Sequence, residues 1–122
     1  MKKFLTLLLL VLSYINSNNF YSQTTLDIYY QSSVPIAGFQ FNVYDVIILS
    51  AYGGAADEAG FLLDNSSDVV IGFSLLGAVI PPGSGLLVTL EIEGDPADAC
   101  ISNQIIANSN GDSLESIVIH AL

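Results

Sequence analysis

Apolar and polar residues alternate with a period of two along three segments of the chain. The apolar positions are Leu26, Ile28 and Tyr30 in the first segment, Phe39, Phe41 and Val43 in the second, and Leu86, Val88, Leu90 and Ile92 in the third. Side chains of a β-strand point alternately to its two faces, so this period predicts strands with one buried face and one face in water.

Two further segments, residues 46–49 and 69–75, are almost continuously apolar and rich in β-branched side chains. Such runs predict strands that are covered on both faces or that lie at a contact between two chains. Residues 101–107 and 117–119 are two more strand candidates.

Turn-forming residues separate these segments. Pro81 and Pro82 cannot donate a hydrogen bond to a neighbouring strand, so the chain is expected to leave the sheet there. Only residues 55–63, which are Ala-rich with acids near their start, favour a helix. About seven short strands with frequent turns predict an all-β fold, an antiparallel β-sandwich or barrel.

The N-terminus has the pattern of a secretory signal peptide. Lys2 and Lys3 precede an apolar run over residues 4–15 and a polar stretch over residues 16–19. A membrane-spanning helix needs about 20 apolar residues, so this run is too short to be an anchor. We therefore expect residues 1–22 to be a helical signal peptide and residues 23–122 to be a single secreted or cell-surface domain without a membrane span.

Charge narrows the range of partners. The 122 residues include 12 acids and two basic residues, and both basic residues lie in the predicted signal peptide. Nucleic acids and anionic lipids are bound through Lys and Arg, so neither is an expected ligand. Cys100 is the only cysteine, which excludes a disulfide within the chain. A buried, inert thiol is expected for it, with an interchain disulfide as the alternative.

The order of the segments resembles that of cohesin modules. Residues 36–45, with the sequence IAGFQFNVYD, look like an early cohesin strand, and residues 69–75, which contain Gly72, are similar to the central apolar strand of the family. Residues 85–92, with the sequence GLLVTLEI, resemble a later strand that opens with glycine, and residues 105–112 resemble the last apolar strand and its polar loop.

The resemblance implies a jelly-roll β-sandwich that binds and does not catalyse. Cohesins receive dockerin modules in secreted assemblies that degrade polysaccharide, so a dockerin-like protein partner is expected. The positions that match the partner-binding face of the family are Gly38, Gln40 and Asn42 on one strand and Ser74, Thr89 and Glu91 on neighbouring strands. The chain is shorter than a typical cohesin, and an uncovered edge strand can be completed by another chain, so self-association remains an alternative.

No catalytic constellation emerges from the sequence. His120 is the only histidine and lies two residues from the end of the chain, where a Ser-His-Asp triad is not expected. Glu91 and Glu93 share one strand face, as a glycosidase pair can, but that face is predicted to be in water. We therefore expect a protein that is not an enzyme.

Two other ligands remain open from the sequence. Tyr29 and Tyr44 are at outward strand positions where rings can stack on a sugar, which makes carbohydrate binding the alternative function. Asn108, Asn110 and Asp112 alternate along a loop and offer oxygen ligands for Ca²⁺. Such Asn-Gly turns also form without a metal, so no cofactor is required.

Overall fold

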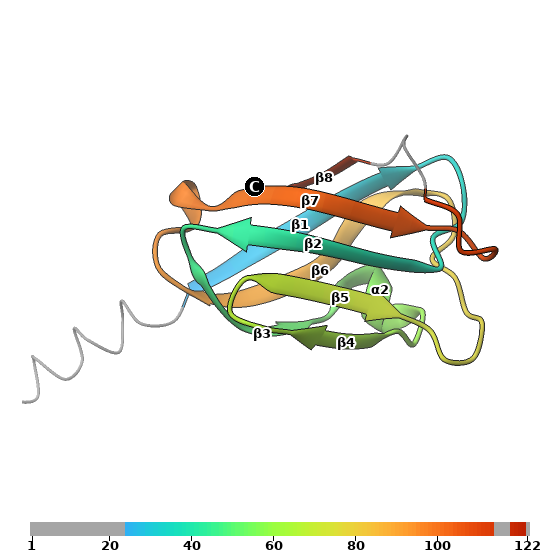
Figure 1. The fold of residues 1–122 in the computed structure, drawn as a ribbon, viewed down its shortest axis with the longest axis horizontal. Coiled ribbons are helices and arrows are strands. Elements are labelled where there is room, and N and C mark those ends of the chain that lie inside the picture. The colour runs from blue at the N-terminus through green and yellow to red at the C-terminus, as the bar shows by residue number, and fades with distance from the viewer. Residues whose placement is uncertain (1–23, 114–117, 122) are drawn as a thin grey trace, which may run out of the picture.

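The computed structural model describes residues 24–113 and 118–121, and the predicted signal peptide, residues 1–22, lies outside them. Two four-stranded antiparallel sheets pack face to face, as expected for a β-sandwich (Figure 1). One sheet has the strand order β3-β6-β1-β8 and the other has the order β4-β5-β2-β7. The strands are β1 (Thr24–Ser32), β2 (Gly38–Tyr44), β3 (Ile47–Tyr52), β4 (Leu62–Asn65), β5 (Val69–Phe73), β6 (Gly83–Glu93), β7 (Cys100–Ala107) and β8 (Val118–Ala121).

The core lies between the sheets and is built from the alternating apolar positions. Strands β1 and β6 contribute Leu26, Ile28, Leu90 and Ile92, and strand β2 contributes Phe39, Phe41 and Val43, all of them buried. Burial of a large apolar side chain stabilises a fold by about 1.5–3 kcal/mol, so this interior is the main source of stability in a domain without disulfides. The alternation predicted for the first two segments is confirmed.

The third segment departs from strict alternation at one residue. Ile28 pairs with Val88 and the next residue, Tyr29, pairs with Leu86, so Leu87 is the extra residue of a β-bulge on β6. Leu87 is fully buried and Leu86 only partly so, which is the reverse of the predicted order. The sequence pattern cannot show this shift because a bulge changes the register without changing the residue types.

Among the described residues, nothing covers the outer face of the two continuous apolar runs. In the first run Ile47 and Leu49 are 49% and 44% exposed, while Val46 and Ile48 are buried. The second run ends as a strand at Phe73, and the chain then turns into the β5–β6 loop. The prediction of two strands is confirmed, and their alternative placement at a contact between two chains stays a prediction.

Two smaller predictions also change. The helix α2 covers only Gly54–Glu58, because the chain turns at Gly60, which has a φ of 77° that favours glycine. The prediction of a buried thiol is wrong: Cys100 is exposed at the first position of β7, an edge strand. Its side chain points away from the core because its cross-strand partner, Tyr44, is itself an outward residue.

Candidate functional site

The outer surface of the β4-β5-β2-β7 sheet, here called the front face, faces the viewer in Figure 1. Its residues follow from the register, because Phe39, Phe41 and Val43 point into the core and the intervening residues of β2 must point outward. Cross-strand pairing then places the outward residues of the other strands beside them. The front face consists of Gly38, Gln40, Asn42 and Tyr44 on β2, Val69, Ile71 and Phe73 on β5, Leu62 and Asp64 on β4, and Cys100, Ser102, Ile105 and Ala107 on β7.

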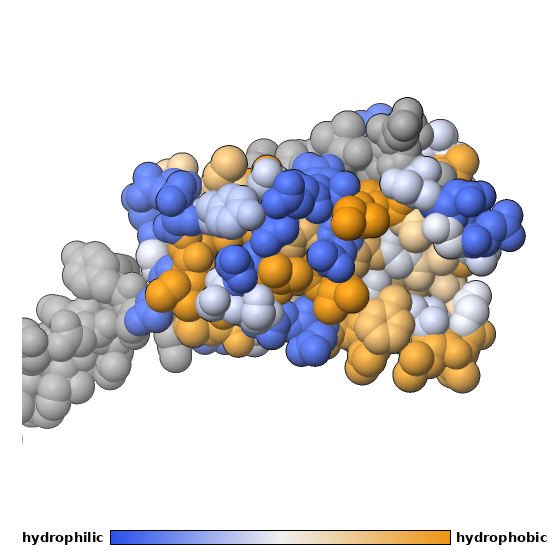
Figure 2. All heavy atoms as spheres, in the orientation of Figure 1, coloured by the Kyte–Doolittle hydropathy of each residue, from blue (hydrophilic) through white to orange (hydrophobic). Residues whose placement is uncertain are grey.

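Apolar side chains occupy much of this front face. Leu62 is paired with Phe73, and Ile105 is paired with Gln40, which also pairs with Ile71. Leu62 and Ile105 are 49% and 52% exposed, values that are high for large aliphatic side chains in a folded domain. Figure 2 shows this apolar surface interleaved with polar surface over the sheet. Exposed apolar surface that surrounds a few polar groups is typical of a site for a macromolecular partner.

One end of the front face is polar and held by hydrogen bonds. Asn103 donates from Nδ2 to Oδ1 of Asn42 at 3.3 Å and to the hydroxyl oxygen of Tyr44 at 3.2 Å. Asn103 lies where the register between β2 and β7 shifts, and its φ is 54°. The shift directs this amide onto β2, so the side chains of Asn42 and Tyr44 are oriented before any partner arrives. Preorganisation of this kind lowers the entropy lost on binding.

The structure brings together only part of the predicted partner-binding set. Gly38, Gln40 and Asn42 are outward neighbours on β2, as expected. Ser74 directly follows β5, but its hydroxyl oxygen accepts hydrogen bonds from the N–H groups of Leu76 and Ala78 at 3.1 and 2.9 Å. Ser74 therefore shapes the β5–β6 loop.

Thr89 and Glu91 do not belong to the front face, and placing them beside β2 was wrong. Both lie on β6, which pairs with β1 and β3 in the opposite sheet. Their pattern shows which residues point outward, but it does not show to which sheet the strand belongs. A long strand between two others in a sandwich can join either sheet, and only pairing decides.

The outer surface of the β3-β6-β1-β8 sheet, here called the back face, is more polar where β1, β3 and β6 meet. Thr89 donates from Oγ1 to Oδ1 of Asp27 at 2.9 Å, and Ser50 donates from Oγ to Oε2 of Glu91 at 3.3 Å. These hydrogen bonds give the carboxylates of Asp27 and Glu91 donors from the neighbouring strands β6 and β3. The back face therefore carries hydrogen-bonded polar groups on these strands, and it exposes Ile47, Leu49 and Tyr52 along its edge strand β3.

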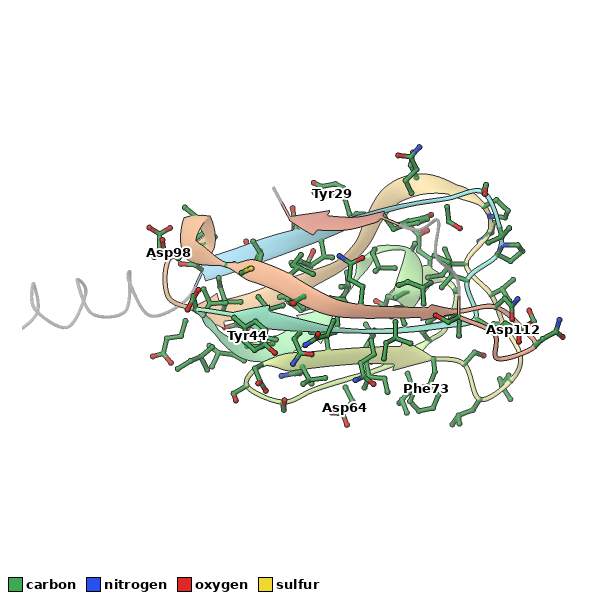
Figure 3. All side chains as sticks on the ribbon, turned by 45° about the horizontal axis from the view of Figure 1, so that its top comes forward. Tyr29, Tyr44, Asp64, Phe73, Asp98 and Asp112 are labelled. Atoms are coloured by element: carbon green, nitrogen blue, oxygen red, sulfur yellow. The ribbon has the colours of Figure 1, made fainter. Side chains whose placement is uncertain are left out.

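The two tyrosines of the carbohydrate alternative lie on different sheets. Tyr29 is on β1 in the back sheet and Tyr44 is on β2 in the front sheet, and Figure 3 shows them apart on these two layers. A sugar stacks on rings that share one surface, so these two side chains do not form one platform.

The predicted calcium loop follows β7 and is closed by its own hydrogen bonds. Oδ1 of Asn108 accepts from the N–H groups of Asn110 and Asp112, each at 3.0 Å. Because this oxygen already has two donors, the turn keeps its shape without a cation. Within the described residues no cluster of three or more His, Cys, Asp or Glu side chains is arranged to hold a metal ion.

A cavity of about 500 Å³ opens between α2 and the segment that leads into β6. Its polar lining side chains are Tyr30, Glu58 and Ser84, and the remainder are Ala, Val, Pro and Gly. Among the described residues that line it, Glu58 is the one carboxylate, whereas glycoside hydrolysis uses a pair. No helix in the part of the chain that the structure describes is long and apolar enough to cross a membrane.

Sequence reasoning missed the apolar half of the front face. Leu62, Ile71, Phe73 and Ile105 look like core residues in the sequence, and three of the four lie within or beside apolar runs. Their only sequence signal is that these runs lack the polar alternation found in β1 and β2. That signal led to the expectation of a second covering layer or a contact between chains, without indicating which face needed cover.

Comparison with solved structures identifies the fold. A chain of the CaDoc0917–CaCohA2 complex, a cohesin–dockerin pair, superposes with a TM-score of 0.57 and 14% identity, covering 78% of this chain and 83% of that chain. A non-cellulosomal cohesin from the hyperthermophilic archaeon Archaeoglobus fulgidus superposes with a TM-score of 0.55 and 10% identity, covering 77% of this chain and 73% of that chain. No protein-family model matches the sequence, and no curated protein matches it either. The chain has a cohesin-like β-sandwich fold, as its segments predict.

Proposed function

We propose that this protein is a non-catalytic, extracellular binding module that receives a protein partner on its front face. The observation that carries the proposal is the arrangement at the centre of the front face, where Gln40 lies between the half-buried Ile71 and the exposed Ile105. The back face also exposes Ile47, Leu49 and Tyr52 on its edge strand β3, but its middle strands β1 and β6 carry hydrogen-bonded polar groups at their centre.

The likeness to cohesins supports a partner of the dockerin kind, since one neighbour comes from a complex of such a pair. The proposal takes Gln40 and Asn42 as partner-binding residues, since both point outward on β2, the strand that resembles the partner-binding strand of cohesins. The proposal includes export through a signal peptide at residues 1–22, supported by the order of charged, apolar and polar residues there, and a place in a secreted or surface assembly that degrades polysaccharide. Self-association through an edge strand is the alternative that the test must separate.

The test uses isothermal titration calorimetry with a panel of purified dockerin modules. In the double variant Ile71→Thr and Ile105→Thr, the front face loses apolar contact area but keeps β-branched side chains that suit a strand. Central apolar contacts dominate binding energy, so this variant should weaken binding about 10-fold or more.

Ile47→Thr is the matched control, because Ile47 is 49% exposed on β3 of the opposite sheet. Its affinity should equal that of the unmodified protein. Equal weakening by both variants, or no binding by any dockerin and no self-association, would contradict the proposed function.

A further inference from the structure

The front face is bordered by carboxylates that have no basic neighbour. Asp64 lies within it, paired across the strands with Ile71, and its side chain extends away from the sandwich on the same side as Phe73 (Figure 3). At the C-terminal end of β2, Asp45 follows Tyr44, and the backbone oxygen of Asp68 accepts a hydrogen bond from the N–H of Val43 at 2.9 Å. All three aspartates are exposed.

No basic side chain in the part of the chain that the structure describes neutralises these carboxylates. The donors to these carboxylates are uncharged groups: Oδ1 of Asp64 accepts a hydrogen bond from the N–H of Asn65 at 2.9 Å, and Oδ1 of Asp68 accepts one from Oγ of Ser66 at 3.2 Å. Residues 4–122 contain no Lys or Arg. The charge at the border of the front face is therefore available to a partner.

The same charge makes a second copy of this chain an unfavourable occupant. Residues 23–122 carry all 12 acids of the sequence, so two copies repel each other at any orientation. A contact through the two front faces would also bring the three border aspartates of one copy toward those of the other. Like charges placed opposite each other suppress association.

An apolar projection extends the front face at the end near Phe73. Leu75 and Leu76 are 78% and 96% exposed in the β5–β6 loop, and Figure 2 shows apolar surface where this loop lies. The hydroxyl oxygen of Ser74 accepts hydrogen bonds from two backbone N–H groups of this loop. Gly77, with a φ of 79°, allows the chain to turn there. The two leucines are thus presented by a defined turn. A partner that covers this end must offer apolar surface.

We propose that the partner is a basic polypeptide whose contact surface combines apolar side chains with flanking Lys or Arg. The apolar side chains cover Ile71, Ile105 and the leucines of the loop, and the cations meet Asp64 along the β4 edge and Asp45 with Asp68 at the adjoining end of the sheet. This inference rests on the proposed function. It adds that charge complementarity selects the partner and accelerates its association.

The probes are two synthetic amphipathic peptides about 18 residues long, one made of Leu and Lys and the other of Leu and Glu, a length that supports a helix. Binding is measured by fluorescence anisotropy with the full chain. The Leu-Lys peptide should bind, and its affinity should fall at least about 10-fold between about 50 mM and about 300 mM NaCl, because salt screens exposed charges. The Leu-Glu peptide should not bind. Equal binding of both peptides, or no binding of the Leu-Lys peptide, overturns the inference.

Two double variants with the same change in charge locate the contact. Asp64→Asn with Asp68→Asn removes two charges from the border of the front face and should weaken Leu-Lys binding about 3- to 10-fold. Asp27→Asn with Glu93→Gln removes two charges from the back face and should have little effect. If both double variants weaken Leu-Lys binding equally, the net charge of the protein alone attracts the peptide, and the inference is overturned.

Two further results separate this inference from the proposed function. If a dockerin binds the front face with an affinity that does not change with salt, the inference is wrong and the proposed function stands. If light scattering after size-exclusion chromatography at low salt shows a dimer that Ile71→Thr with Ile105→Thr dissociates, the second copy is the occupant and the inference is overturned. If the peptide binds as expected but no protein partner uses this face, the proposed function fails instead.

Discussion

Adding one methyl group at Gly72 should destabilise the fold, although Gly72 has no positive φ. Gly72 is a buried residue of β5 and pairs with Phe39 on β2. A Cβ at this position would lie 2.5 Å from Cζ and 2.6 Å from Cε1 of Phe39, and 3.0 Å from Cδ2 of Leu63. Normal carbon contacts are about 3.5–4.0 Å, so the Phe39 ring must move by about 1 Å.

The ring has little room for that movement. Phe39 is 3% exposed, and its ring centroid lies 6.0 Å from that of Phe41 and 6.2 Å from that of Phe61, in stacked arrangements. Overpacking of this kind costs about 1–3 kcal/mol, so Gly72→Ala should lower the free energy of unfolding by that amount. Each kcal/mol lowers the melting temperature of a domain of this size by about 4–8 °C.

The assay is urea unfolding followed by circular dichroism and tyrosine fluorescence, since the chain has no tryptophan. Gly38→Ala is the control, because Gly38 pairs with Phe73 on the same two strands and an added Cβ would meet its nearest atoms at 3.4 and 3.7 Å. This variant should be neutral or stabilising by up to about 1 kcal/mol, because alanine restricts the unfolded chain.

A double-mutant cycle tests the cause. In the presence of Phe39→Leu, the loss caused by Gly72→Ala should shrink by about 0.5 kcal/mol or more, since the ring that causes the clash is gone. If Gly72→Ala leaves the urea midpoint unchanged, or if the two substitutions are additive, the close approach of the ring to Gly72 is not what requires glycine here.

Three other outcomes follow from the structure. Asn108→Ala should lower the free energy of unfolding by about 1 kcal/mol, measured by thermal melts, because two backbone N–H groups lose their acceptor. This loss should be the same with and without Ca²⁺, and a difference between the two conditions would show that the loop binds the ion. Cys100 should react with a thiol reagent in the native protein at a rate close to that in urea, because it is exposed, and slow native labelling would contradict its placement. Raising NaCl from about 10 mM to about 1 M should raise the melting temperature, because the Debye length falls from about 30 Å to about 3 Å and the repulsion among 12 acids weakens.

The front face shows how far sequence reasoning reaches for the candidate site. Gln40 and Asn42 were found because they alternate with Phe39, Phe41 and Val43, so their outward direction follows from the strand period. Their neighbours on β5 and β7 were not found, because cross-strand neighbours depend on register and strand order.

The sequence by itself determined most of the strands and, on β1 and β2, their inward faces. Alternation of apolar residues fixes which side chains are buried, because side chains that follow one another in a strand point to opposite faces. Because the sequence has a single cysteine, no disulfide within the chain can form, and packing must hold the domain together. Because no Lys or Arg follows Lys3, the surface of the domain is acidic.

Only the tertiary structure decided which outward residues share a surface. Strand pairing assigned β6 to one sheet and β2 to the other, which separated Thr89 and Glu91 from Gln40 and placed Ile71 and Ile105 beside it. The bulge at Leu87 and the turn of Asn103 onto Asn42 are also products of pairing. The physical reason is that hydrogen bonds between strands join residues far apart in the chain, and the period of a single strand carries no information about its neighbours.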